Sequence, residues 1–168
     1  MSAQKEVFTF NPKNLQQAEE LVAKFPAGRQ KSAMLPLLDL AQRQNGGWLS
    51  TSAIEYVANY LGEPFMRAYE VASFYSMFNL RPVGKYHIQV CGTTPCWLQG
   101  ASDIMSACEQ HAKTKCGETS KDGMFTISEV ECLGACINAP IVQINDDYYE
   151  NLDAKKIATI INKLKETV

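Results

Sequence analysis

The sequence predicts an α+β protein, with a helical bundle over residues 1–80 followed by a domain of mixed strands and helices over residues 81–168. The first observation is a change of period. Apolar residues recur at helical spacing in the first half, whereas the segment "YHIQV" at 86–90 alternates as a strand does. The second is that Pro82 and Gly84 interrupt the chain between the two patterns. The third is that every cysteine lies in the second half, so thiol chemistry is expected there alone.

Helix start and stop signals divide the first half into helices. Asn11 is placed to cap a first helix that begins at Pro12. A second helix is expected from about Gln30 to Gln44, where "NGG" at 45–47 ends it, and Pro36 should kink it or delay its start.

Two further helices complete the expected bundle. Ser50 or Thr51 caps one that Gly62 closes, and Pro64 opens the next. The residues expected to face the core are Leu15, Ala18, Leu21, Val22, Met34, Leu35, Leu38, Ala41, Ile54, Val57, Ala58, Leu61, Phe65, Ala68, Tyr69, Ala72 and Tyr75. The segment "SFYSMF" at 73–78 is rich in aromatic residues, and it suits either the bundle core or a docking surface.

In the second half we expect strand, helix, strand, strand, strand and helix. The elements are a strand at 86–90, a helix at 99–113, strands at 125–130, 141–145 and 148–150, and a final helix capped by Asp153. A thioredoxin-like sheet accommodates this order, with one cysteine loop after its first strand and an antiparallel hairpin near the end. His87 alternates with the apolar face and is interpreted as an outward strand residue, and His111 as a solvent-facing helix residue.

Composition is that of a soluble globular protein, with 46% hydrophobic and 20% charged residues among 168. The net charge is −2 and the basic residues form no dense block, so neither nucleic acid nor an anionic membrane surface is an expected partner. The sequence has no signal-peptide core and no apolar run long enough for a membrane span, so direct membrane insertion is not expected. Met1 argues against a cleaved transit peptide, and a bacterial cytoplasm fits best.

Six cysteines in a reducing compartment favour metal ligation over disulfides. Four of them form two close pairs, Cys91 with Cys96 and Cys132 with Cys136, in the pattern C-x4-C-x35-C-x3-C. Each pair follows a predicted strand, and Gly134 lets the main chain come close to the second pair. Four thiolates around one centre leave no open coordination position. The pattern therefore indicates a structural metal or an electron-transfer cluster rather than a hydrolytic metal.

The spacing excludes several known cysteine sites. Plant-type ferredoxins need C-x4-C-x2-C, but Gln99 stands at the third position, and neither the bacterial two-cluster run nor a thioredoxin-type C-x-x-C is present. A Rieske centre needs two histidine ligands, but the two histidines here, His87 and His111, are expected on a strand and on a helix. Zinc and iron–sulfur both remain open, although the lack of two-residue knuckles favours iron. Cys108 is expected to be a buried hydrophobe on a helix face and Cys116 a bystander at the helix end.

Three segments together resemble the thioredoxin-like [2Fe-2S] ferredoxin subunit of the NADH-dehydrogenase module of respiratory complex I. They are "FYSMFNLRPVGKYHIQVCGTTPCWLQG", "VECLGACINAP" and "FPAGRQKSAMLPLLDLAQRQNGGWLS", and the match extends over nearly the whole chain. The resemblance implies a thioredoxin-like [2Fe-2S] domain at 81–168 behind a helical docking bundle at 1–80. It also implies that Cys91, Cys96, Cys132 and Cys136 are the cluster and metal ligands, and that Cys108 and Cys116 are not.

The same resemblance implies the setting of the cluster. The chain would be a subunit of NADH:quinone oxidoreductase with no catalytic residue of its own. Its partners would be a flavoprotein subunit that binds FMN and NADH and the larger iron–sulfur subunit of the module. The expected place is the cytoplasmic side of the bacterial inner membrane, or the matrix side if the protein is organellar. Consistent with this, the chain has neither a G-x-G-x-x-G motif nor a phosphate loop with which to hold the nucleotide itself.

Other hosts and functions stay open at this point. Similar subunits serve NAD-linked formate dehydrogenases and hydrogenases. A zinc-stapled interaction module without redox activity is the alternative of another class, and a free-standing ferredoxin would not need the helical first half. Around a cluster, the expected amide donors are those of Gly92, Thr93, Thr94, Leu133, Gly134 and Ala135. Trp97 either packs at a helix start, shields the cluster or meets the partner.

Overall fold

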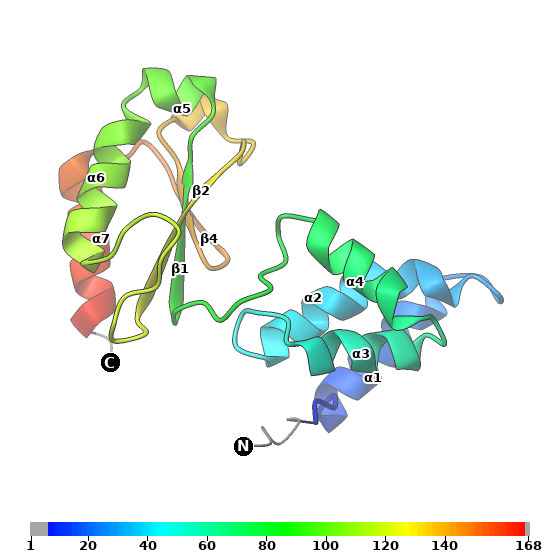
Figure 1. Ribbon diagram of the computed structural model, residues 1–168. Coiled ribbons are helices and arrows are strands. Elements are labelled where there is room, and N and C mark those ends of the chain that lie inside the picture. The colour runs from blue at the N-terminus through cyan, green and yellow to red at the C-terminus, as the bar shows by residue number, and fades with distance from the viewer. Residues whose placement is uncertain (1–6, 167–168) are drawn as a thin grey trace. The chain divides into compact units, whose positions relative to one another are not determined.

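The computed structural model describes residues 7–166, and within them the chain forms two compact units whose boundary falls between Pro82 and Val83 (Figure 1). The first unit is helical, and the second combines a sheet with helices. Their hydrophobic cores share no residue, so each unit is described by itself.

The helical unit contains the expected helices. They are α1 (Pro12–Ala23), a 3-10 turn η1 (Gln30–Ala33), α2 (Met34–Gln44), α3 (Thr51–Tyr60) and α4 (Phe65–Phe74). The Asn11 side chain accepts a hydrogen bond from the Asn14 N–H at 2.8 Å, and Ser50 Oγ accepts one from the Ala53 N–H at 3.2 Å. Both caps therefore act as the sequence predicts. Pro36 lies in the first turn of α2, and the α-helix begins at Met34 after the 3-10 turn rather than at Gln30.

The core of this unit is built from one face of each helix. Ala18, Leu38, Val57 and Ala68 are fully buried at its centre. The predicted face was incomplete, because Leu37 and Leu40 of α2 are buried as well. Leu15, Tyr69 and Tyr75 were expected to face the core, and this was wrong, because all three are exposed. Phe74 and Met77 are exposed too, while Phe78 is buried. The aromatic segment at 73–78 thus contributes both to the core and to the surface.

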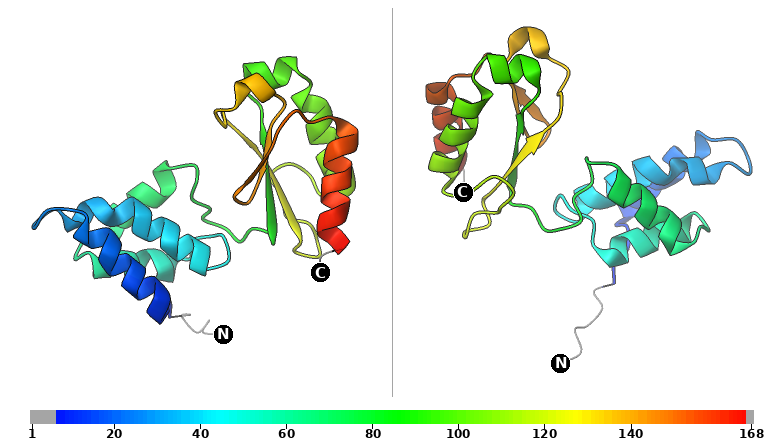
Figure 2. Two further views of the ribbon diagram at one scale, coloured as in Figure 1. Left: turned by 180° about the vertical axis from the view of Figure 1, so that it is seen from behind. Right: turned by 45° about the horizontal axis from the view of Figure 1, so that its top comes forward.

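The second unit is a four-stranded mixed sheet with two helices against one face (Figures 1 and 2). In chain order its elements are β1 (Tyr86–Cys91), α5 (Thr94–Leu98), α6 (Ala101–Ala112), β2 (Phe125–Val130), a 3-10 turn η2 (Cys136–Asn138), β3 (Val142–Ile144), β4 (Asp147–Tyr149) and α7 (Ala154–Glu166). The strand order is β2-β1-β3-β4, with β1 and β2 parallel and the β3–β4 hairpin antiparallel. This confirms the α+β class and the expected hairpin.

Helices α6 and α7 lie side by side on the sheet and close its core. Ile104 and Cys108 of α6 pack with Ile157 and Ile161 of α7 against β1 residues such as Ile88. Asp153 caps α7, since its side chain accepts a hydrogen bond from the Lys156 N–H at 2.8 Å.

The helix expected at 99–113 is α6, which begins at Ala101, and the short helix α5 before it was not expected. Gly100 adopts a left-handed conformation, with φ of 90°, and separates α5 from α6. A positive φ cannot continue a right-handed helix, and glycine takes it without steric cost. Because α5 begins at Thr94, Cys96 lies inside a short helix rather than in an open loop.

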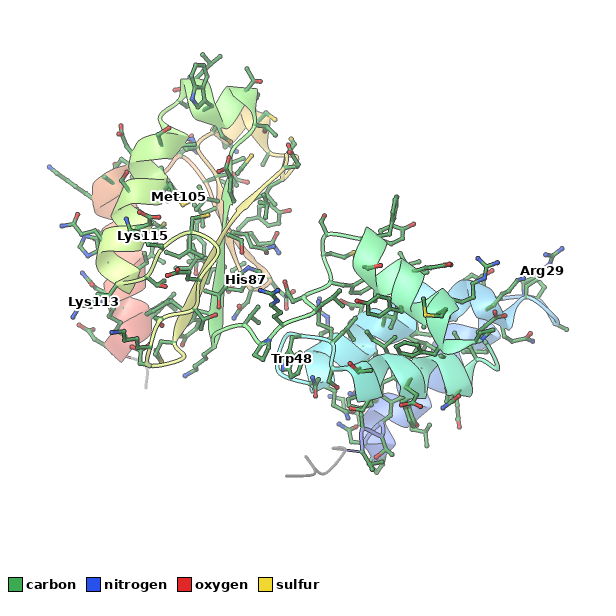
Figure 3. All side chains as sticks on the ribbon, viewed as in Figure 1. Arg29, Trp48, His87, Met105, Lys113 and Lys115 are labelled. Atoms are coloured by element: carbon green, nitrogen blue, oxygen red, sulfur yellow. The ribbon has the colours of Figure 1, made fainter. Side chains whose placement is uncertain are left out.

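His87 is buried, and its prediction as an outward residue was wrong. Only 9% of its surface is exposed, and Nε2 lies 2.9 Å from Ser128 Oγ of β2 (Figure 3). Thr126, its neighbour on β2, is buried too. The Thr126 hydroxyl accepts a hydrogen bond from the Gly84 N–H and shares one with the Thr119 hydroxyl. Segments before β1 and before β2 thus cover the sheet at Thr126. Burial lowers the pKa of the His87 imidazole.

No helix among the described residues is long and apolar enough to cross a membrane.

Candidate metal centre

Both cysteine pairs lie at one end of the sheet. Cys91 is the last residue of β1, and Cys132 follows β2 by one residue. Because β1 and β2 are parallel and Cys91 is in register with Val130, the loops that leave the two strands emerge at the same edge. Figures 1 and 2 show α5 and the turn η2 together there. We call residues 91–96 the first cysteine loop and residues 132–136 the second.

Within each loop the two sulfurs are close. Cys132 Sγ and Cys136 Sγ are 3.5 Å apart. Cys91 and Cys96 each shift the pKa of the other, so their thiols are near one another as well. Cys91 and Cys96 also belong to a small buried cluster with Ile141, against which Leu133 of the second loop packs. Residues of the two loops therefore meet in a common core, which makes the four cysteines a candidate for one site.

The two pairs differ sharply in exposure. Cys91 and Cys96 are 1% and 0% exposed, whereas Cys132 and Cys136 are both exposed. The difference follows from the elements that carry them, since a central strand and a packed helix hold the first pair and an irregular surface segment holds the second.

The thiols interact electrostatically across the two loops. Burial raises the pKa of Cys96 to about 11, helped by the hydrogen bond and charge of Cys91. For Cys136 the hydrogen bond that its thiol shares with Cys132 comes first among the causes that raise its pKa, and the charge of Cys91 in the other loop adds to them. Like charges repel at this range, so several thiolates are stable here together only with a cation between them.

Cys91 is the exception among these thiols. Burial acts to raise its pKa, but hydrogen bonds from the Thr93 hydroxyl, the backbone N–H groups of Leu133 and Thr93 and the Cys96 thiol outweigh burial and lower it. The Thr93 hydroxyl oxygen lies 3.2 Å from Cys91 Sγ. Cys91 is thus the sulfur best prepared to be a thiolate.

Backbone amides serve as donors to the sulfurs, partly as the sequence predicts. Thr93 and Leu133 direct N–H groups to Cys91, and the Gly134 N–H lies 3.4 Å from Cys132 Sγ, where Gly134 has a φ of 85°. Gly92 does not fit that role, because its N–H donates to the Val130 carbonyl at 3.0 Å.

Sequence reasoning missed the amide of Ile141, which donates to Cys96. Ile141 follows Pro140, whose peptide bond to Ala139 is cis, and the Ile141 carbonyl accepts from the Cys91 N–H at 3.2 Å. One residue from the segment before β3 therefore supports both cysteines of the first loop. Only the distant pairing of β1 with β3 brings it there, so no local pattern points to it.

The donor set fits a thiolate-bound cluster. Four soft sulfur ligands select zinc, copper(I) or iron–sulfur centres, and a [2Fe-2S] cluster takes four cysteine thiolates. Within residues 7–166, no three side chains among His, Cys, Asp and Glu are grouped as ligands of one ion. The sulfurs come as two pairs, an arrangement that suits a centre of two irons with two thiolates on each.

The remaining cysteines lie apart from this edge of the sheet. Cys108 is fully buried between α6 and the sheet, as the helical pattern predicts, and burial raises its pKa to about 12. Cys116 is exposed, and its N–H donates to the Glu109 carboxylate at 3.0 Å.

Apolar side chains surround the exposed side of the site. Trp97 is 62% exposed, Leu98 69% and Ile137 94%. The exposure of Trp97 means that its ring is not part of the domain core. Three large apolar groups beside one site are unusual on a free surface and typical of a protein interface.

Comparison with known proteins identifies the family. The sequence profile of the thioredoxin-like [2Fe-2S] ferredoxins matches residues 18–165. An NADH-quinone oxidoreductase subunit of Rickettsia conorii is 65% identical over 158 residues, which are 94% of this chain and 95% of the relative. The mitochondrial NADH dehydrogenase [ubiquinone] flavoprotein 2 of Dictyostelium discoideum is 49% identical over 94% of this chain and 64% of its own length.

A solved structure supports the fold. An NAD+-reducing [NiFe]-hydrogenase in the air-oxidized state superimposes with a TM-score of 0.68 at 22% identity, over 78% of this chain and 23% of the hydrogenase chain. At that identity the likeness concerns the fold alone. From the profile match and the high identity to its relatives, the chain belongs to the thioredoxin-like [2Fe-2S] ferredoxin family.

Proposed function

We infer that the protein is an electron-transfer subunit of NADH:quinone oxidoreductase that carries one [2Fe-2S] cluster. The observation that carries this function is the 65% identity to the Rickettsia conorii oxidoreductase subunit along nearly the full length of both chains. The meeting of two thiol pairs at one edge of the sheet supports it, because the fold provides the four sulfurs that such a cluster requires.

The cluster ligands in this proposal are Cys91, Cys96, Cys132 and Cys136. Cys91 and Cys96 are held inside the domain, so they form a rigid half of the site. Cys132 and Cys136 lie on an exposed segment, which leaves their half of the site next to any partner that docks there.

A bound [2Fe-2S] cluster takes up or releases one electron at a time, and its charge with four thiolates changes from about −2 to about −3 on reduction. The protein's part is to stabilise that charge. The N–H groups of Thr93, Leu133, Gly134 and Ile141 are directed at the sulfurs, and a peptide N–H that donates to sulfur disperses negative charge. With four sulfurs bound there is no place for a substrate, so the chain has no catalytic residue of its own.

The partners in this proposal are a flavoprotein subunit that binds FMN and NADH and the larger iron–sulfur subunit of the same module. Trp97, Leu98 and Ile137 support a protein partner over the cysteine site, because they form an exposed apolar rim beside it. Phe74, which is 81% exposed at the end of α4, supports a docking role for the helical bundle of residues 1–80. The place of the complex is the cytoplasmic side of a bacterial inner membrane, or the matrix side in an organelle.

The alternatives carry less support. A zinc-stapled module is disfavoured because the family takes its name from a [2Fe-2S] cluster. A diaphorase module of a hydrogenase or formate dehydrogenase shares the fold, but the relatives with high identity are named as subunits of NADH-quinone oxidoreductase.

The test is anaerobic purification followed by iron and sulfide analysis and electron paramagnetic resonance. We expect a brown protein with equal iron and acid-labile sulfide and a paramagnetic signal only after reduction. Serine in place of Cys91, Cys96, Cys132 or Cys136 should each alter that signal, because an alkoxide or water ligand replaces a thiolate. Cys108→Ser and Cys116→Ser are the controls and should keep it. A colourless protein with one zinc would contradict the function, and loss of the signal in folded Cys108→Ser would contradict the ligand assignment.

A further inference from the structure

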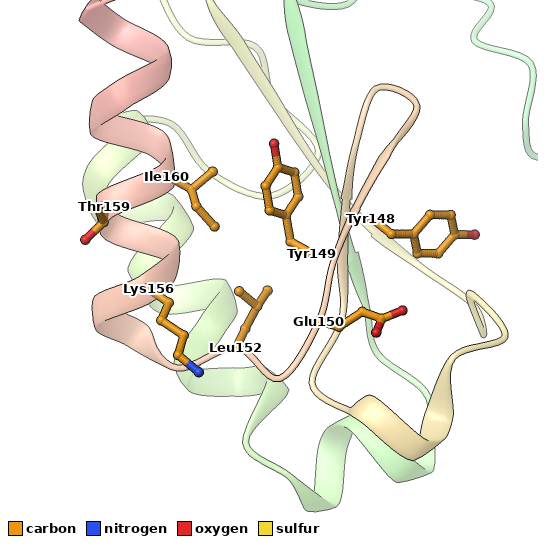
Figure 4. A pocket seen from close by; sticks show the side chains of 7 residues that line it. All are labelled: Tyr148, Tyr149, Glu150, Leu152, Lys156, Thr159 and Ile160. Atoms are coloured by element: carbon orange, nitrogen blue, oxygen red, sulfur yellow. The ribbon is translucent and has the colours of Figure 1, made fainter.

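Tyr148 of β4 reaches the second cysteine loop. Its hydroxyl donates a hydrogen bond to the Leu133 carbonyl, with 3.2 Å between the oxygens. Tyr148 and the next residue, Tyr149, point to opposite sides of the strand (Figure 4). Tyr149 packs with the core under α7, whereas Tyr148 is half exposed and directed towards the turn that carries Cys132.

The bonded carbonyl belongs to the peptide unit that serves a ligand sulfur. The Leu133 C=O and the Gly134 N–H are the two ends of one peptide group, and that N–H lies 3.4 Å from Cys132 Sγ. A donor on the carbonyl polarises the peptide and makes its N–H a stronger donor. The chain of contacts therefore runs from the Tyr148 hydroxyl through one peptide group to the sulfur.

Leu133 also interacts with the first cysteine loop. The N–H of Leu133 itself donates to Cys91. The N–H groups of Leu133 and Gly134, on either side of the Leu133 α-carbon, thus each serve a sulfur of one pair, and the Tyr148 hydroxyl bonds the Leu133 carbonyl between them. Fixing this carbonyl orients donors to both halves of the site.

A hydrogen bond from outside the turn matters here because a glycine gives the turn's backbone a wide range of accessible conformations. Gly134 adopts a φ of 85°, and glycine has a wide choice of conformations there. Further along, the Asn138 side chain donates to the Glu150 carboxylate at 2.6 Å, and the Asn151 N–H donates to the Asn138 carbonyl at 2.7 Å. Those bonds tie the far end of the turn to the residues after β4, and Tyr148 ties the end that bears Cys132.

We propose that Tyr148 is a positioning residue that sets the reduction potential of the cluster through the Leu133–Gly134 peptide. The proposal rests on the proposed function, since it requires the cluster at the four cysteines. Hydrogen bonds to ligand sulfur favour the more negative, reduced state and raise the potential. Loss of the hydroxyl leaves the Gly134 N–H a weaker and less well oriented donor, so the reduced state becomes harder to form.

The experiment is a redox titration of the full-length, cluster-loaded protein followed by electron paramagnetic resonance. Tyr148→Phe should keep the iron and sulfide content of the unmodified protein, shift the midpoint potential to more negative values and change the g-values. Tyr149→Phe is the matched control, because it loses the same hydroxyl from the same strand on the side away from the loop. Its potential and g-values should equal those of the unmodified protein.

Each other outcome has a defined meaning. An unchanged potential in loaded Tyr148→Phe overturns the proposal, and so does an equal shift in Tyr149→Phe. If Tyr148→Phe loads poorly, 3-fluorotyrosine at position 148 keeps the ring and strengthens the O–H donor. It should move the potential to more positive values, and no movement overturns the proposal. An unmodified chain that binds no iron and sulfide refutes the proposed function itself, and the role of Tyr148 falls with it.

Discussion

His87 couples the stability of the sheet to pH. Burial lowers its pKa, so the folded protein resists protonating the ring, while in the unfolded chain the ring takes a proton below a pH of about 6.5. The unfolded state therefore binds more protons in acid, and the free energy of unfolding falls as pH decreases through this window. Above it, the neutral ring keeps its contact with Ser128 at no such cost.

We expect His87→Gln to weaken this pH dependence. Glutamine keeps an amide for Ser128 but has no proton to gain, so the loss of stability between pH 7.5 and 5.5 should shrink, by no more than about 1.4 kcal/mol for one proton over one pH unit. Urea unfolding of the metal-free protein at both pH values measures it. An equal loss in the variant and the unmodified protein would mean that His87 is not the titrating group.

For single residues, the sequence predicts local properties better than it predicts which side chains become neighbours in the fold. The positive φ of Gly134 and the burial of Cys108 could be anticipated, because turn chemistry and helical periodicity are local properties. His87 was misjudged because alternation does not reveal what covers the second face of a sheet. Ile141 and Tyr148 could not be found at all, since each meets the cysteine loops only through pairing between distant strands.

Among the elements, the segment just before β1 packs so closely against the start of β2 that Gly84 has no room for a side chain. A Cβ on Gly84 would lie 2.8 Å from the backbone N and C of Phe125, and neither atom can move without disturbing the ladder. A Cβ on Gly92, at the other end of β1, would lie 2.1 Å from Oε1 of Glu129, which is the far end of a flexible side chain. The two clashes thus differ in how easily they are relieved.

Gly84→Ala should therefore destabilise the domain, by about 1–3 kcal/mol as is typical of overpacking. Gly92→Ala is the matched control and should cost less, because Glu129 can rotate away. Chemical unfolding of the metal-free variants compares the two. Equal losses, or no loss in Gly84→Ala, would show that the strands separate without strain.

Element boundaries could be predicted wherever a side chain marks them. Asn11, Ser50 and Asp153 cap the helices as expected, because a capping side chain and its backbone partner lie within three residues of each other. The short helix α5 was missed, since five residues are too few to show a helical period, and the left-handed Gly100 separates it from α6.

For the whole molecule, the two units have separate cores, and we therefore expect each to fold without the other. The core of the helical unit uses residues between 10 and 78, and the cores of the second unit use residues between 88 and 161. A boundary near residue 80 could be anticipated because the hydrophobic period changes there, and the structure divides the chain between Pro82 and Val83.

A fragment of residues 83–168 should accordingly fold and load a cluster with the spectrum of the full chain. Residues 1–82 alone should be helical and colourless. Circular dichroism, iron analysis and electron paramagnetic resonance of the two fragments check this. Failure of 83–168 to bind iron, under conditions in which the full chain does, would mean that the helical unit is needed to complete the site.

The position of α7 has a consequence for how the protein is made. Ile157 and Ile161 are fully buried and complete the core beneath the sheet that carries the cysteine loops. A ribosome releases the chain from its N-terminus, so all four cysteines leave the exit tunnel before this helix does. The sulfurs are then present in a nascent domain whose core is still open. The domain that holds the cysteines is therefore complete, and ready to receive iron and sulfide, only after residues 154–166 have been translated and have packed against the sheet.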